Sequence, residues 1–269
     1  MIVCLILLQH CIYGFNPHVT TTMNPDMNPD DDYLKDLRHS NRILREALAV
    51  YACTDETNLL VSVLNGGYCL VAATDETSPL TGGWYNTGNI HAYGHFPGDV
   101  GMTHKLSEFL PPNSNILDVG AGQGQYKFLF SHIRPDIQWT GIDGAINIEQ
   151  YTKDYIQYHD ICTHYPLEWV NQYDWVFSIE VAEHLPIECQ ENYISLLIQT
   201  SRVGIVLSWS DEYAPPHHIN PRNNAYVKNL LSQYGYIADE EAEIVLRESV
   251  SELLYLKDTL MIFRNVNID

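Results

Sequence analysis

The sequence predicts an α/β fold in which a mostly parallel sheet of seven strands has helices on both faces and is preceded by an N-terminal helix and hairpin. From residue 115 onward, short apolar segments alternate with longer amphipathic segments, as in consecutive βαβ units. A glycine-rich turn follows the first apolar segment, and acidic residues end the next two. Together these features predict a ligand site at the carboxyl ends of the strands.

The overall charge argues against a protein that binds nucleic acid. The chain of 269 residues has 34 acidic and 14 basic side chains, which gives a net charge of −20. A nucleic-acid binder needs a basic surface that neutralises phosphates. A role that depends on binding a polyanion over the whole protein is therefore disfavoured. The hydrophobic content of 45% is that of a folded protein rather than a disordered chain.

Residues 1–14 form an apolar segment that resembles the apolar region of a secretory signal, with Gly14 as a cleavage point. The segment has no basic residue and is shorter than the roughly 20 residues of a membrane span, so we expect no stable transmembrane helix. A core strand or an incorrect start site would also account for it. The compartment therefore stays open between the secretory pathway and the cytoplasm.

An N-terminal extension over residues 33–112 is expected after a flexible linker, residues 15–32, that is rich in Asn, Pro, Asp and Thr. Within the extension, residues 33–52 have leucines at helical spacing and predict an amphipathic helix. Residues 61–72 predict a hairpin around an Asn-Gly turn. The aromatic, turn-rich residues 82–99 fit either a lid over the site or an ordinary packed loop.

The six cysteines have no metal-ligand spacing, so a structural zinc site is not expected. In an oxidising compartment, Cys53 and Cys69 could close a short loop. The sequence alone leaves the disulfide state open.

Residues 113–269 are expected to form the main domain. Its predicted strands cover residues 115–119, 139–143, 157–160, 175–179, 204–209, 243–247 and 259–263. Helices are predicted between them, for example over residues 191–201 and 225–234. Because parallel strands need crossover connections, this alternation favours a doubly covered, Rossmann-like sheet.

The glycine-rich turn directly follows the strand that ends in Asp118-Val119, and it reads Gly120-Ala121-Gly122-Gln123-Gly124. Glycines suit such a turn because the backbone must bend sharply and admit a ligand closely. Gln125 stands where the dinucleotide fingerprint has its last glycine, which disfavours an NAD-dependent oxidoreductase.

The next two strand ends each have an acidic residue. Asp143, followed by Gly144, could accept two hydrogen bonds from a ribose diol. Asp160, followed by Ile161, could accept one from an exocyclic amine. A glycine turn, a diol acid and an adenine-side acid, in this order, predict a nucleoside pocket at the carboxyl edge of the sheet.

Over roughly residues 113–264, the chain resembles the class I S-adenosylmethionine-dependent methyltransferases. The markers are residues 118–124, Asp143, Asp160 and the run Ser178-Ile179-Glu180-Val181-Ala182-Glu183-His184-Leu185-Pro186. The resemblance implies a seven-stranded sheet with an antiparallel last strand, and S-adenosylmethionine as the cofactor. It also implies methyl transfer to an oxygen or nitrogen nucleophile of a small molecule or protein.

The resemblance further implies which residues meet the cofactor. The glycine turn would lie against its methionine part, Asp143 would hold the ribose, and Asp160 would meet the adenine. The expected cofactor-binding residues are Asp118, Gly120, Ala121, Gly122, Gln123, Gly124, Asp143, Gly144, Asp160, Ile161 and Glu180.

Methyl transfer from a sulfonium is an in-line displacement, so a general base is needed only when the nucleophile has a proton to lose. His218 is the preferred candidate, with His184 and Glu183 beside it as further catalytic candidates. Plainer alternatives stand beside these roles: His184 could cap a helix, Glu180 could orient backbone or cofactor, and His217 and His218 could be a solvated loop pair. His217 and His218 could also be metal ligands together with a carboxylate, but no metal is expected, because catalytic metal sites usually need three protein ligands at workable geometry.

Trp209 and Asn220 are the candidate substrate-binding residues, although a Trp at a strand end more often packs in the core. Residues 207–222 look like those of a less characterised animal, algal and viral branch of the family. That branch tends to have a glycine-rich stretch where this chain has residues 212–216, which contain no glycine. This departure keeps open an inactive module that binds S-adenosylmethionine in a structural or regulatory role.

Overall fold

The computed structural model describes residues 39–43, 83–85, 92–94, 98–145, 148–213 and 218–267. The chain divides into two units, Met1–Ala52 and Cys53–Asp269. In the first unit, residues 39–43 are helical, within the predicted helix. In the second unit, β1 (Gly83–Tyr85) and β2 (Ala92–Gly94) form an antiparallel pair. The predicted signal, linker and 61–72 hairpin lie outside the described residues.

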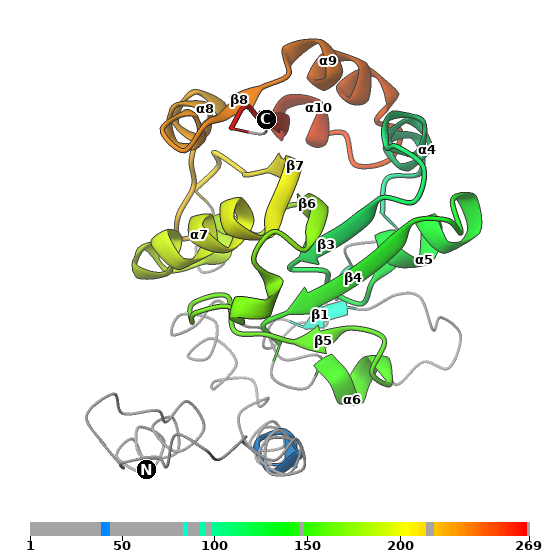
Figure 1. The fold of residues 1–269 in the computed structure, drawn as a ribbon, viewed down its shortest axis with the longest axis vertical. Helices are drawn as coiled ribbons and strands as arrows, with labels where there is room; N and C mark the ends of the chain where they lie inside the picture. Colours follow the sequence, from blue (N-terminus) through cyan, green and yellow to red (C-terminus); the bar gives the residue numbers. More distant parts are fainter. Residues whose placement is uncertain are drawn as a thin grey trace. The chain divides into compact units, whose positions relative to one another are not determined.

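The second unit contains a seven-stranded sheet, as the sequence predicted. Its order is β5-β4-β3-β6-β7-β9-β8 (Figure 1). β3 to β7 pair in parallel, and β9 is antiparallel to both of its neighbours. The strands are β3 (Asn115–Val119), β4 (Gln138–Asp143), β5 (Gln157–Tyr158), β6 (Tyr173–Ser178), β7 (Ser201–Ser208), β8 (Tyr236–Ala238) and β9 (Leu260–Asn265).

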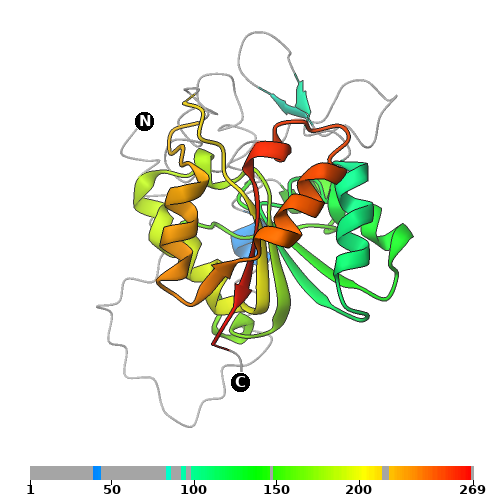
Figure 2. The same cartoon turned by 90° about the horizontal axis from the view of Figure 1, so that it is seen from above.

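Helices cover both faces of this sheet (Figure 2). Side chains alternate between the faces along each strand, and on β3 Ile116 packs in one core while Leu117 packs in the other. The Ile116 side is covered by α4 (Val100–Phe109), α5 (Gln125–Ile133), α9 (Glu240–Ser249) and α10 (Leu256–Thr259). The Leu117 side is covered by α7 (Gln190–Thr200) and α8 (Asn224–Ser232), and a smaller cluster forms at α6 (Ile148–Thr152).

One predicted strand is wrong. Residues 243–247 belong to helix α9, and the strand is β8, earlier in the chain. Asp239 caps the helix by accepting a hydrogen bond from the backbone N–H of Ala242 at 3.1 Å, and Glu243 and Leu246 are buried at helical spacing. The N-cap and this three-residue period outweigh the apolar run Ile244-Val245, which is exposed.

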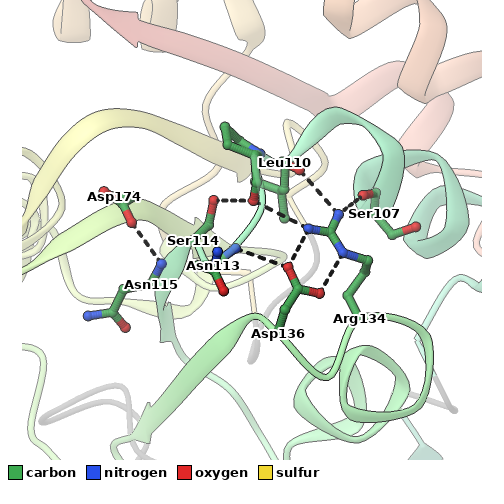
Figure 3. Close-up of polar contacts among 9 residues, drawn as sticks. Ser107, Leu110, Asn113, Ser114, Asn115, Arg134, Asp136 and Asp174 are labelled. Carbon is green, nitrogen blue, oxygen red and sulfur yellow. Dashed lines mark hydrogen bonds and ion pairs between the residues drawn. The ribbon is translucent and has the colours of Figure 1, made fainter.

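Arg134, just after α5, links the end of α4 to the segment before β4, near the amino ends of the strands (Figure 3). Its guanidinium donates to the carbonyls of Ser107 and Leu110 at the end of α4, where helical carbonyls lack partners. It also holds Asp136 through hydrogen bonds of 2.8 and 2.7 Å. These hydrogen bonds, with one from the backbone N–H of Asn113, keep the pKa of Asp136 well below its ordinary value.

The structure contains a disulfide between Cys162 and Cys189, with Cα atoms 4.6 Å apart. Cys162 lies just after β5, and Cys189 ends the short turn η3 (Ile187–Cys189) before α7. The alternative pair, Cys53 and Cys69, lies outside the described residues. In the described part of the chain, no helix has the length and apolar character needed to cross a membrane.

Candidate functional site

The glycine turn between β3 and α5 has a backbone that only glycine adopts easily. Gly120, Gly122 and Gly124 have φ angles of 76°, 55° and 84°. A Cβ atom on Gly120 would lie 2.4 Å from a methyl group of Val181. The backbone N–H groups of Gly120 and Ala121 both donate to the carbonyl of Ile142 at 2.9 Å, which fixes the turn to the end of β4.

Asp143 joins this turn to the loop that follows β4. One carboxylate oxygen accepts from the backbone N–H of Gly122 at 2.9 Å, and the other from that of Ala145 at 2.8 Å. Burial raises the pKa of Asp143 to about 6, although these two hydrogen bonds oppose the rise. Each oxygen can accept a second hydrogen bond. At neutral pH, Asp143 is therefore a fixed carboxylate with acceptor capacity to spare.

The other two acids of the expected pocket differ in their surroundings. Asp160 is buried and accepts from the backbone N–H of Cys162 at 2.9 Å, in the loop after β5. Asp118 accepts from the indole N–H of Trp139 at 3.0 Å, and burial raises its pKa to about 7. The Trp139 ring stacks on Phe130 in the core on the α4 and α5 side. Asp118 is therefore bonded to the core through Trp139 in this structure.

Five more residues expected at the cofactor lie in the loops that follow β3, β4 and β5. Ala121 and Ile161 are buried, and Gly144 is half-buried. Gln123 and Gly124 complete the turn, with Gly124 as the N-cap residue of α5. The structure thus brings the ends of β3, β4 and β5 together as one edge, which the order of the strands predicts.

A second group of polar side chains follows β6. Glu180 has a φ of 55°, which is rare for a residue with a side chain. Its backbone N–H donates to the hydroxyl of Ser208, at the end of β7, at 2.8 Å. Its carboxylate accepts from the hydroxyl of Thr259 at 3.4 Å. Burial raises the pKa of Glu180.

Glu183 and His184 belong to the next turn, η2 (Ala182–His184). Glu183 has no exposed surface, and neither of its carboxylate oxygens has a hydrogen-bond partner among the described residues. Burial, followed by the charge of Glu180, raises its pKa well above the ordinary value. The Nε2 atom of His184 lies 3.9 Å from Oε1 of Glu183.

The segment after β7 is anchored on this turn. The carbonyl of Glu183 accepts from the backbone N–H groups of Ile219 and Asn220, at 2.8 and 2.9 Å. The rings of His184 and His218 meet edge to face, with centroids 4.9 Å apart. The Nδ1 atom of His218 lies 3.0 Å from the carbonyl of Glu212. Since a carbonyl only accepts, a neutral His218 holds its proton on Nδ1 and has a lone pair on Nε2.

The two candidate substrate-binding residues lie inward. Trp209 has no exposed surface, donates its indole N–H to the carbonyl of Asn220 at 2.7 Å and packs against Tyr193. This is the position that the core-packing alternative describes. Asn220 is also buried, and its amide oxygen has no hydrogen-bond partner among the described residues.

Two residues near this group were not predicted from the sequence. Thr259 bonds to Glu180, and burial together with the charges of Glu180 and Glu183 raises the pKa of Tyr255. Thr259 is the last residue of α10 and Tyr255 is its N-cap residue, and both are distant from β6 in the sequence. Only the antiparallel return of β9 beside β7 brings them to this edge, so no local motif could have indicated them.

Comparison with known proteins gives a likeness of fold. No protein-family model and no curated protein matches the sequence. Magnesium protoporphyrin IX methyltransferase of Synechocystis PCC 6803, solved with S-adenosylmethionine, is 14% identical, with a TM-score of 0.42 over 61% of this chain and 74% of that one. Phosphoethanolamine N-methyltransferase 2 of Haemonchus contortus is 15% identical, with a TM-score of 0.40 over 62% of this chain and 52% of that one.

A third solved structure is a putative methyltransferase of Haloferax volcanii in complex with the activator Trm112. It is 12% identical, with a TM-score of 0.46 over 62% of this chain and 89% of that one. At such identities the likeness concerns the fold alone. The strand order, with β9 antiparallel in an otherwise parallel core, is that of the class I S-adenosylmethionine-dependent methyltransferases, and the chain has their fold.

Proposed function

We propose that this chain binds S-adenosylmethionine and transfers its methyl group to an oxygen or nitrogen nucleophile of a small molecule or a protein. The observation that supports this best is the position of Asp143. Its carboxylate fixes the glycine turn to the end of β4, and each of its oxygens can accept one more hydrogen bond. A pair of neighbouring hydroxyl groups on a ribose fits this arrangement.

The other cofactor contacts follow from the same edge of the sheet. The Gly120–Gly124 turn would admit the methionine part, because its glycines present backbone without side chains. Asp160, buried at the end of the next strand, would accept from the adenine amine. When bound, S-adenosylmethionine supplies an activated methyl group on its sulfonium sulfur. This chain's own residues then have to align the acceptor and exclude water.

Glu183, His184 and His218 would form the acceptor side of the site, and Glu180, expected at the cofactor, comes just before η2. These residues follow β6 and β7, which are neighbouring strands. Val181, in the same segment after β6, lies against Gly120 and so places this group next to the glycine turn. His218 is the residue best suited to take a proton from the acceptor, since its Nε2 lone pair is set by the Nδ1 contact to Glu212. His184 and Glu183 would position it and the acceptor.

Calorimetric titration of the purified full chain tests cofactor binding. We expect S-adenosylmethionine and S-adenosylhomocysteine to bind with micromolar affinity, about −8 kcal/mol, and NAD not to bind. Asp143→Ala should lose this binding, whereas Glu168→Ala, at an exposed acid outside the expected cofactor-binding residues, should keep it. Absence of binding to a folded wild-type chain would overturn the proposal.

Turnover is tested separately, by measuring release of S-adenosylhomocysteine with panels of small-molecule alcohols, amines and acidic or basic peptides. A methylated acceptor supports the enzyme. Cofactor binding without methylation of any acceptor, in a chain whose Asp143→Ala variant no longer binds, would instead favour the inactive binding module.

A further inference from the structure

Three side chains with metal-ligating atoms converge beside the end of β6. Among the residues that the structure describes, Glu183, His184 and His218 offer one carboxylate oxygen and two imidazole nitrogens, all within 4.8 Å of one another. Glu183 and His184 are neighbours in η2, and His218 comes from the segment after β7. At these separations between the ligating atoms, small side-chain rotations would bring all three atoms onto one shared ion.

The state of Glu183 is a second, independent observation. Its side chain is fully buried, and neither carboxylate oxygen has a partner of good hydrogen-bond geometry among the described residues, although the Glu180 carboxylate lies close enough to raise its pKa. Native proteins almost always satisfy buried polar groups, and a buried carboxylate without a partner is costly. A cation bound by these oxygens would satisfy them.

The orientation of His218 also suits a ligand. Its Nδ1 lies 3.0 Å from the carbonyl of Glu212, which leaves Nε2 with a free lone pair in the neutral ring. Histidines that bind metals commonly donate their other ring N–H to a carbonyl in this way. The main-chain hydrogen bonds from Ile219 and Asn220 to the Glu183 carbonyl hold the two segments together without an ion, so the site is built in advance.

We propose that Glu183, His184 and His218 bind one divalent transition-metal ion, through one carboxylate oxygen and two imidazole nitrogens. Two imidazoles and a carboxylate suit ions such as Zn²⁺, Mn²⁺ or Fe²⁺ and are a poor set for Mg²⁺ or Ca²⁺, which prefer oxygen ligands. Three protein ligands leave coordination positions open, as in catalytic rather than structural sites. Metal binding here does not depend on methyl transfer.

The ion would change the role of His218. Coordination uses the Nε2 lone pair that would otherwise accept a proton from the methyl acceptor. The two roles exclude each other, so a metal titration decides between them.

The test uses the untagged full chain after removal of metals with a chelator. Zn²⁺ and Mn²⁺ should each bind in calorimetry with one strong site per chain, and Mg²⁺ should not. Co²⁺ should produce visible absorption bands of a nitrogen- and oxygen-ligated ion. Glu183→Gln, His184→Ala and His218→Ala should each lose the strong site and these bands, whereas His104→Ala, an exposed histidine on α4, should keep both.

Circular dichroism confirms that each variant is folded, and Glu183→Gln keeps the shape of the side chain if an alanine variant does not fold. A strong site that persists in all three folded variants would overturn the proposal, and so would failure of Zn²⁺ and Mn²⁺ to bind the wild-type chain. S-adenosylmethionine is titrated into the same wild-type sample. If it binds while the metals do not, the metal proposal fails and the proposed function stands.

Discussion

Glu180 shows how a single residue shapes the site. Its left-handed backbone costs on the order of 1 kcal/mol or more for a residue with a side chain. The hydrogen bond from its N–H to Ser208 holds the chain in this conformation at the end of β6. Strained residues of this kind cluster at functional sites, and here the bend leads directly into the turn that contains Glu183 and His184.

Asp143 leads to a prediction about pH. Burial raises its pKa to about 6, and only the carboxylate can accept hydrogen bonds at both oxygens. We therefore expect the titration of Asp143 to lower the affinity for S-adenosylmethionine by up to about tenfold per pH unit below this pKa. Titrations between pH 5 and 8 would measure this.

Asp143→Asn is the matched control, since the amide keeps the shape but does not titrate in this range. Its weaker affinity should vary less with pH than that of the wild type. The pH dependence that remains in this variant would come from the titration of other groups, chiefly Asp118 with its pKa of about 7. Equal pH dependence in the two proteins would contradict the assignment of Asp143.

At the scale of elements, the pairing of β6 with β7 creates the second part of the site. Ser178 lies opposite Leu207 in the parallel register, so the turn after β6 and the segment after β7 leave the sheet side by side. The carbonyl of Glu183 then accepts from Ile219 and Asn220. Two stretches that are distant in sequence are thereby held as one surface.

The disulfide is the second feature at this scale. Cys162 and Cys189 are separated by 27 positions, and closing a loop of this size restricts the unfolded chain. We expect Cys162→Ser and Cys189→Ser each to lower the free energy of unfolding by about 3 to 4 kcal/mol. Urea unfolding under non-reducing conditions measures the difference.

The double variant and the reduced wild type serve as controls. Both lack the same cross-link, so their stabilities should lie close to those of the single variants. A double variant that loses about twice as much as each single one would show that the two side chains act through their packing, and not through a bond between them.

At the scale of the whole molecule, Asp99 joins two segments of the second unit that are far apart in the sequence. Its buried carboxylate caps α4 through Met102 and accepts from the backbone N–H groups of Ser251, Glu252 and Leu253, at distances from 2.7 to 3.1 Å. Helix α4 therefore packs in the same core as the sheet, although the sequence grouped it with the N-terminal extension. The domain boundary near residue 113 stays a prediction.

Replacing Asp99 tests this link. Burial raises its pKa, but the backbone N–H donors outweigh that effect and hold the pKa below its ordinary value. The carboxylate thus stabilises the fold above about pH 4, and this contribution is lost as the pH falls toward the lowered pKa. We expect Asp99→Asn to lower the free energy of unfolding by about 3 kcal/mol at pH 7, and by less at pH 3.

Urea unfolding at the two pH values measures both effects, with the exposed Glu168→Gln as control. The same loss at pH 3 and pH 7 would mean that Asp99 acts through its shape and not through its charge.

Local patterns in the sequence determined most of the fold. The alternation of apolar and amphipathic segments predicted six of the strands, because each βαβ unit is encoded by residues close together in the chain. The glycines of residues 120–124 and the position of Asp143 predicted the joined ends of β3 and β4 for the same reason. The error at residues 243–247 arose because a short apolar run fits a strand or a helix, and here the N-cap at Asp239 and the helical spacing of the buried side chains favour the helix.

Contacts between distant segments were decided by the tertiary structure alone. The sequence named Glu183, His184 and His218 as candidates that could converge, and it expected no metal, but it could not show how closely their ligating atoms approach one another. It could not show that Trp209 lies in the core, or that Tyr255 and Thr259 reach Glu180. Strand order and the antiparallel return of β9 determine these neighbours, and both depend on packing summed over the whole sheet, which no short stretch of residues encodes.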